Sequence, residues 1–189
     1  MKTKSKISYS KILVIILLAS IFNGFSQKTK LKIGDKIPFF ELFNQYGNIY
    51  SSYDNINKKS QVICFYPEDE SVLCTKQFCE IRNNIKTFEK YNAVVVGINS
   101  ESIVNHRRFV LKNKIPVSLL FDRNNNVQEM FGVPNQGNSK KPKRFTFIIN
   151  KKGVITNIFY NKKNIQYHIN QSLLALNNLN NINNLQNEN

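Results

Sequence analysis

The sequence predicts an α/β fold in which one mixed central β-sheet is flanked by helices. Short apolar runs alternate with longer amphipathic segments through the middle of the chain, which is typical of parallel strands joined by helices. Two strand-like segments joined by a tight turn follow, as expected of an antiparallel pair. The length of 189 residues suits a single domain with one core.

Residues 1–26 are expected to be a signal peptide. A basic start with four lysines precedes an apolar run at 12–22, and the small residues Gly24 and Ser26 favour cleavage before Gln27. The run is shorter than the ~20 residues that a membrane-spanning helix needs. The protein is therefore expected to be exported, periplasmic or secreted, with a membrane anchor as the alternative if the segment stays uncleaved.

The domain is expected to span residues 27–176 and to begin with a β-hairpin. Segments 39–43 and 49–52 read as its strands, with turn-forming residues between them. A buried strand at 61–66 follows and ends at Pro67, which cannot continue a strand ladder.

Next come a helix at 73–91, a buried strand at 93–98 and a helix at 102–112. The first of these helices has apolar residues at three- and four-residue spacing, which predicts one buried stripe. The residues of this stripe are Phe78, Ile81, Ile85 and Phe88.

The later elements complete a thioredoxin-like order with an N-terminal β-hairpin extension. A strand at 118–121 and a short helix at 127–131 precede two strands at 144–149 and 154–160, which form the late antiparallel pair. A last helix at 165–176 closes the domain, and the Asn-rich, low-complexity tail 177–189 receives no function.

The formal net charge of +15 falls to about +11 once the four lysines of the expected signal are left out. The remaining basic residues are scattered through loops and pairs, and no nucleic-acid-binding motif accompanies them. We therefore expect a solvated basic surface and no nucleic-acid partner.

Cys74 is the candidate nucleophile among three cysteines. It falls in the first turn of a predicted helix, where free backbone N–H groups and the helix dipole stabilise a thiolate, the reactive form. Ser71 is placed to cap that helix. The acidic segment 68–70 opposes a nearby negative charge, though only modestly if these side chains face water.

Cys79 lies five residues after Cys74 on the same predicted helix. In an intact helix their Cα atoms would be roughly 8.7 Å apart, and a disulfide needs about 7 Å or less. A bond between them would therefore require local unwinding. Spacing alone leaves open that they are two unrelated thiols.

Several short motifs surround these cysteines and continue along the domain. A strand end Phe-Tyr-Pro leads into a loop with a hydroxyl residue and a Cys-Thr pair, and the second cysteine follows. The motifs are Gly34–Pro38, Phe65–Pro67, Ser71, Cys74–Thr75, Cys79, Leu120–Asp122, Phe131–Val133 and Arg144–Ile149.

Through these motifs the chain resembles the peroxiredoxins from about residue 31 to residue 176, in particular the peroxiredoxin Q or bacterioferritin comigratory protein type, within the AhpC/TSA-like proteins of thioredoxin fold. The resemblance implies a thiol peroxidase that acts on hydrogen peroxide and organic hydroperoxides. Cys74 would be the peroxidatic cysteine and become a sulfenic acid. Cys79 would be the resolving cysteine and form an intramolecular disulfide with it.

The resemblance also implies the other site residues and the partners. Arg144 would stabilise the thiolate and orient the peroxide, and Ser71 and Pro67 would complete the site. A thioredoxin-like thiol donor would recycle the enzyme, which would be a monomer and need no cofactor or metal. The chain departs from the family loop in carrying Val72 and Leu73 where Pro-Gly is common, which leaves loss of activity as an alternative.

Three further expectations concern residues away from this loop. Cys64 lies within an apolar strand and should be a small core residue. His106 and His168 show no metal-ligand spacing and are expected to face solvent. The main alternative function is an exported thiol–disulfide oxidoreductase, which would normally carry C-x-x-C, and a third is a binding module without catalysis.

Overall fold

The computed structural model describes residues 31–187, so the expected signal peptide lies outside the described residues. Within that range, no helix combines the length and apolar character that crossing a membrane demands.

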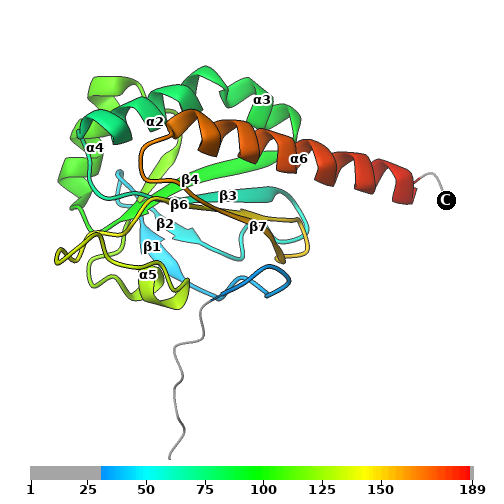
Figure 1. Cartoon of the computed structure of the whole chain (residues 1–189), viewed down its shortest axis with the longest axis horizontal. Helices are drawn as coiled ribbons and strands as arrows, with labels where there is room; N and C mark the ends of the chain where they lie inside the picture. Colours follow the sequence, from blue (N-terminus) through cyan, green and yellow to red (C-terminus); the bar gives the residue numbers. More distant parts are fainter. Residues whose placement is uncertain (1–30, 188–189) are drawn as a thin grey trace, which may run out of the picture.

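A five-stranded mixed sheet forms the centre of the molecule (Figure 1). Its strand order is β5-β4-β3-β6-β7, in which β3, β4 and β5 run parallel and β6 and β7 are antiparallel to their neighbours. Both parts of the predicted sheet are thus confirmed. The strands are β3 Ser60–Phe65, β4 Ala93–Asn99, β5 Ser118–Phe121, β6 Phe145–Ile149 and β7 Ile155–Tyr160.

The predicted N-terminal hairpin is also confirmed, as a separate two-stranded antiparallel sheet of β1 Glu41–Phe43 and β2 Ile49–Ser51. It is joined to the large sheet by a bridge between Asn44 and Leu120.

Helices cover both faces of the sheet (Figure 1). Alternate residues of β3 point to opposite faces, so Val62 and Cys64 join one buried cluster while Ile63 and Phe65 join the other. Helices α2, α3, α4 and α6 cover the first cluster, and α5 with the hairpin covers the second. The helices are α2 Val72–Asn83, α3 Ile85–Lys90, α4 Ile103–Asn113, α5 Asn126–Met130 and α6 Ile165–Asn187.

The single helix predicted at 73–91 is wrong in one respect, because the chain breaks at Asn84 into α2 and α3. Asn84 has φ −104° and ψ 8°, outside helical values, and its side-chain amide donates to the carbonyl of Glu80 at 2.9 Å. An asparagine that bonds its own preceding turn competes with the helix ladder. The predicted stripe survives the break, since Phe78, Ile81 and Phe88 are buried and Ile85, partly buried, packs against the same core.

Helix α6 continues beyond the predicted end at Leu176 and runs to Asn187. It crosses the sheet and projects past it (Figure 1). Leu179 still packs against the core, whereas Ile182 and Leu185 are exposed.

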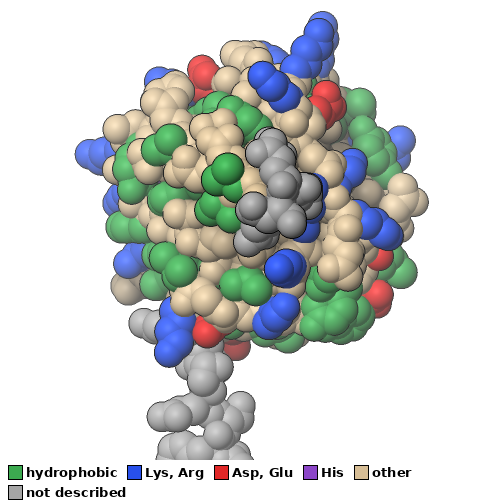
Figure 2. Space-filling view, turned by 90° about the vertical axis from the view of Figure 1, so that its right-hand side faces the viewer, with side chains coloured by type: hydrophobic (Ala, Val, Ile, Leu, Met, Phe, Trp, Pro, Cys, Tyr) green, Lys and Arg blue, Asp and Glu red, His purple; other side chains and the backbone are tan. Residues whose placement is uncertain are grey.

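Positive charge is dispersed on the one face of the molecule that Figure 2 shows. In the face shown in Figure 2, lysine and arginine side chains lie singly among polar and apolar ones instead of forming a continuous patch. This distribution agrees with the expected solvated basic surface.

The expectation that both histidines face solvent is wrong. His106 and His168 are both buried, with 0% and 1% of their surface exposed. His168 lies between the Thr146 hydroxyl and the Asn161 carbonyl, each 2.9 Å from a ring nitrogen. Burial lowers the pKa of His168 below its ordinary value, and Arg144 adds to that effect.

Candidate active site

Cys74 sits in the first turn of α2, directly after the loop that leaves β3. Ser71 is the N-cap, with extended backbone angles of φ −66° and ψ 149°, and its Oγ accepts from the Cys74 backbone N–H at 3.4 Å. The predicted cap is thus confirmed. The Cys74 side chain is fully buried, so it contacts protein groups and not bulk water.

Arg144 reaches the sulfur from the neighbouring strand. It directly precedes β6, which pairs with β3, so its side chain comes to the same end of the sheet from which the Cys74 loop departs. Its Nη2 lies 3.2 Å from Cys74 Sγ, and its Nη1 donates to Gln77 Oε1 on α2. The guanidinium is only 4% exposed, which strengthens its attraction for a thiolate.

A cavity of about 440 Å³ opens beside this pair. Pro67 and Ser71 line it, as does Arg144, so four of the five predicted site residues lie at or directly behind it. Val72, which stands where the family commonly has proline, is 85% exposed at its edge. The remaining lining residues are Glu68, Leu73, Gln136, Gly137, Lys143, Tyr160 and Lys162.

The two outer acidic residues of the loop are partly exposed and pair with cationic side chains. Glu68 pairs with Lys141, whose pKa is raised mainly by that hydrogen bond. Glu70 Oε1 lies 2.9 Å from Nε of Arg108 on α4. Each of these charges has a cationic neighbour, which lessens their repulsion of a thiolate.

Asp69, between them, is the acidic residue that lies deepest. Its side chain is only 4% exposed and contacts His106 Nδ1 at 2.8 Å. Of the three acidic side chains, Asp69 is therefore the one that ties the loop to the interior.

Cys79, the fifth predicted site residue, lies further along α2 and is half-buried. Both cysteines are free thiols on one continuous helix. The sulfur atoms are therefore not brought together in this state, as helix geometry predicts.

Cys64 is a core residue of β3, as expected. It is 2% exposed, and burial raises the pKa of its thiol to about 12, so it stays protonated at neutral pH.

Sequence reasoning missed Gln77, Asp69 and His106. Gln77 carried a signal, because a polar residue on the apolar face of a predicted helix must find a buried partner. Asp69 and His106 lie 37 residues apart and meet only through the fold, so no local pattern could pair them.

Comparison with known proteins identifies the family of the chain. The AhpC/TSA family profile matches residues 33–158. A chloroplastic peroxiredoxin Q of Populus jackii is 34% identical over 174 residues, covering 92% of this chain and 80% of that protein. One from Triticum aestivum is 35% identical over 150 residues, covering 79% and 69%.

Solved structures agree on the fold. Peroxidoxin BcpB from Mycobacterium tuberculosis superposes with a TM-score of 0.74 at 26% identity, covering 79% of this chain and 98% of that one. A PrxQ from Xylella fastidiosa gives 0.72 at 22% identity, covering 79% and 97%. The chain therefore belongs to the AhpC/TSA family and is a peroxiredoxin of the peroxiredoxin Q and bacterioferritin comigratory protein type.

Proposed function

We propose that this peroxiredoxin reduces hydrogen peroxide and organic hydroperoxides with Cys74 as the attacking thiolate. The observation that carries the proposal is the buried guanidinium of Arg144, 3.2 Å from Cys74 Sγ beside an open cavity. A fixed positive charge there favours the thiolate and leaves other N–H donors to orient a peroxide.

In the proposed first step, the thiolate attacks one peroxide oxygen. An S–O bond forms as the O–O bond breaks, the departing oxygen takes a proton and leaves as water or an alcohol, and Cys74 becomes a sulfenic acid. Sulfur loses two electrons and the peroxide gains them.

In the proposed second step, Cys79 attacks the sulfenic sulfur. An S–S bond forms, the S–O bond breaks and water leaves. A dithiol donor of the thioredoxin type then returns both cysteines to thiols by supplying two electrons. The half-buried Cys79 on the same helix supports this assignment, provided that the first turns of α2 unwind.

The cavity supports organic hydroperoxides as substrates beside hydrogen peroxide. Its volume of about 440 Å³ is in the range of small-molecule sites, and Leu73 and Tyr160 give it apolar walls. Comparing turnover of hydrogen peroxide and cumene hydroperoxide would measure this preference directly.

Cellular placement and assembly form a separate part of the proposal. The segment 1–26 would direct export and be removed, and the enzyme would act as a monomer. The curated relatives compared above carry chloroplastic names, which describe those proteins. The N-terminal sequence of the mature protein and its mass in solution test both points.

The central experiment measures peroxide consumption with a dithiol reductant for the wild type, Cys74→Ser and Cys79→Ser. Cys74→Ser should lose turnover, because the serine hydroxyl cannot ionise at neutral pH. When the dithiol is left out, Cys79→Ser should consume one equivalent of peroxide and retain a sulfenic acid that a dimedone probe labels. A Cys74→Ser variant as fast as the wild type would refute the assignment.

The same measurements address the alternative of an exported thiol–disulfide oxidoreductase, which gains no support from the relatives compared above. Such an enzyme would reduce or form disulfides in a protein substrate without consuming peroxide. Peroxide loss in stoichiometry with dithiol oxidation would favour the peroxidase.

A further inference from the structure

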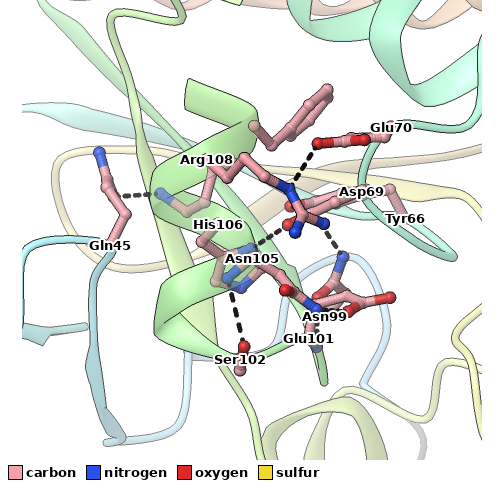
Figure 3. A network of polar contacts seen from close by, with 12 residues as sticks. Gln45, Tyr66, Asp69, Glu70, Asn99, Glu101, Ser102, Asn105, His106 and Arg108 are labelled. Carbon is pink, nitrogen blue, oxygen red and sulfur yellow. Dashed lines mark hydrogen bonds and ion pairs between the residues drawn. The ribbon is translucent and has the colours of Figure 1, made fainter. Parts of the chain in front are cut away.

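A buried polar network surrounds Asp69, five residues before Cys74 (Figure 3). The Tyr66 hydroxyl donates to Asp69 Oδ1 at 2.8 Å, and the Asn99 amide donates to the same oxygen at 3.2 Å. His106 Nδ1 lies 2.8 Å from Oδ2. Because an ionised carboxylate only accepts, this geometry places a proton on Nδ1.

His106 is the most enclosed member of this network. It projects from α4, is 0% exposed, and its Nε2 has no hydrogen-bond partner among the described residues. The ring therefore has one polar contact of consequence, the Asp69 carboxylate. Asn99 ends β4, so the network joins β4, α4 and the active-site loop.

A continuous series of hydrogen bonds leads from this network to the reacting cysteine. The Asp69 carbonyl accepts from the Ser71 backbone N–H at 2.7 Å. Ser71 Oγ in turn accepts from the Cys74 N–H at 3.4 Å. The position of Cys74 relative to Arg144 thus depends on where Asp69 is held.

Aromatic packing fixes the same elements beside the network. Tyr66 meets Phe78 of α2 with ring centroids 4.6 Å apart, and Phe78 meets Phe109 of α4 at 5.9 Å. These contacts fix the rings but involve no residue of the loop that follows Pro67. Its inner side is held through Asp69.

We propose that His106 is a positioning residue for the peroxidase reaction. It holds the Asp69 carboxylate, and through Asp69 and Ser71 it keeps Cys74 at the guanidinium of Arg144. The proposal rests on the proposed function of Cys74. If Asp69 stays fixed, the unwinding that disulfide formation needs is confined to the chain after the loop, in the first turns of α2.

The two chemical steps should respond differently when His106 is changed. Attack on peroxide needs Cys74 placed accurately against Arg144, and small displacements in such a site are costly in rate. Disulfide formation needs Cys74 to leave that place, so a looser loop should not slow it. A residue that served only overall stability would not produce this division.

His106→Asn and His106→Gln test the proposal, because they place the side-chain amide N–H donor at different positions. The Asn side-chain amide can occupy the place of Nδ1, which contacts Asp69, whereas the Gln amide corresponds to Nε2, which does not. His106→Gln should slow attack about tenfold or more, and His106→Asn should restore it to within about threefold of the wild type.

The readout separates the steps in a single turnover with one equivalent of peroxide. Acid-quenched samples analysed by intact mass give the rates of thiol loss and of disulfide appearance. In His106→Gln, the rate of disulfide formation from the sulfenic acid should equal or exceed that of the wild type. Arg108→Gln is the matched control on the same helix, since it removes an exposed pair to Glu70 and should change neither rate more than about twofold.

Two results would overturn the proposal: attack by a folded His106→Gln within twofold of the wild type, or equal slowing of both steps. If His106→Gln does not fold, Tyr66→Phe takes its place, because it removes one donor to Asp69 and keeps the ring. Tyr66→Phe should slow attack alone, and an unchanged attack rate would refute the proposal. Failure of the proposed function itself would differ, because the wild type would then consume no peroxide.

Discussion

The properties of Arg144 depend on its burial and on the two side chains that it contacts. Its guanidinium is buried, with one Nη on Cys74 Sγ and the other on Gln77 Oε1. A buried cation that lacks a counter-charge is costly, so an anionic partner at this place would stabilise Arg144. Neither contact exists in the unfolded chain.

The first prediction concerns the shape of this cation. Arg144→Lys keeps the charge but replaces a planar fork by one ammonium, which cannot contact Cys74 and Gln77 and also orient a peroxide. We expect the rate constant for attack to fall by about a hundredfold, in the range found when a transition-state donor is removed. Competition against another peroxidase under single-turnover conditions measures it.

Arg123→Lys is the matched control, because Arg123 is exposed and does not line the cavity. It should react as fast as the wild type. An Arg144→Lys variant within threefold of the wild type would show that charge alone suffices and that the donor fork has no part in the reaction.

The same residues show what the sequence could predict about the site. Ser71 and Cys74 follow from local helix chemistry, and Arg144 followed only from the resemblance to a family. His106 was expected at the surface because it lies far from the cysteines in the sequence and shows no metal-ligand spacing. Its partner comes from a loop 37 residues earlier.

At the scale of elements, the positions of the strands along the chain were predictable where the physical reason was local. Continuous apolar runs identified β3 and β4, and the turn before β7 identified the late pair. The break at Asn84 was not predictable from the apolar period, since Phe78, Ile81 and Phe88 stay on one face through it. The spacing of apolar residues predicts which face of the helix is buried, but it does not predict whether the helix is interrupted.

The second prediction concerns how α6 is attached to the sheet. His168 Nε2 faces the Asn161 carbonyl, so Nδ1 accepts from the Thr146 hydroxyl, and protonation would remove that acceptor beside Arg144. The folded pKa of His168 lies below the ordinary value of about 6.5. The unfolded chain therefore binds more protons below that pH, and stability should fall as pH drops through about 6.5 and towards the folded pKa.

Urea unfolding of the wild type and His168→Gln between pH 7.5 and pH 5.5 measures this contribution. The wild type should lose stability more steeply, by at most about 1.4 kcal/mol per pH unit from this group. His168→Gln should be less stable near pH 7.5 but flatter with pH. Parallel curves for the two proteins would show that His168 does not titrate differently in the folded state.

For the whole molecule, the main question is which part can move during the reaction. Phe78 lies between the two cysteines on α2, is fully buried, and packs on Tyr66 and Phe109. Removing it from the core would cost about 3 kcal/mol or more, by analogy with the loss of a buried aromatic side chain. Cys74, not the Phe78 region, is therefore the part expected to travel.

The third prediction follows from that balance. In the oxidised protein, the amides between Ser71 and Phe78 should exchange faster with deuterium, since a helix with Cα atoms about 8.7 Å apart cannot hold the bond. The amides of β3, which stay inside the sheet, should keep their protection. Mass spectrometry of reduced and peroxide-treated protein, digested after exchange, gives both values.

Peroxide-treated Cys79→Ser is the control, because it can form the sulfenic acid without a disulfide. It should retain the exchange pattern of the reduced wild type, which would assign the opening to the crosslink and not to oxidation itself. Unchanged protection of the first turns of α2 in an oxidised wild type would mean that the bond, if present, forms by another movement. The core around Phe78 would then have to open, and faster exchange in α3 and α4 would reveal it.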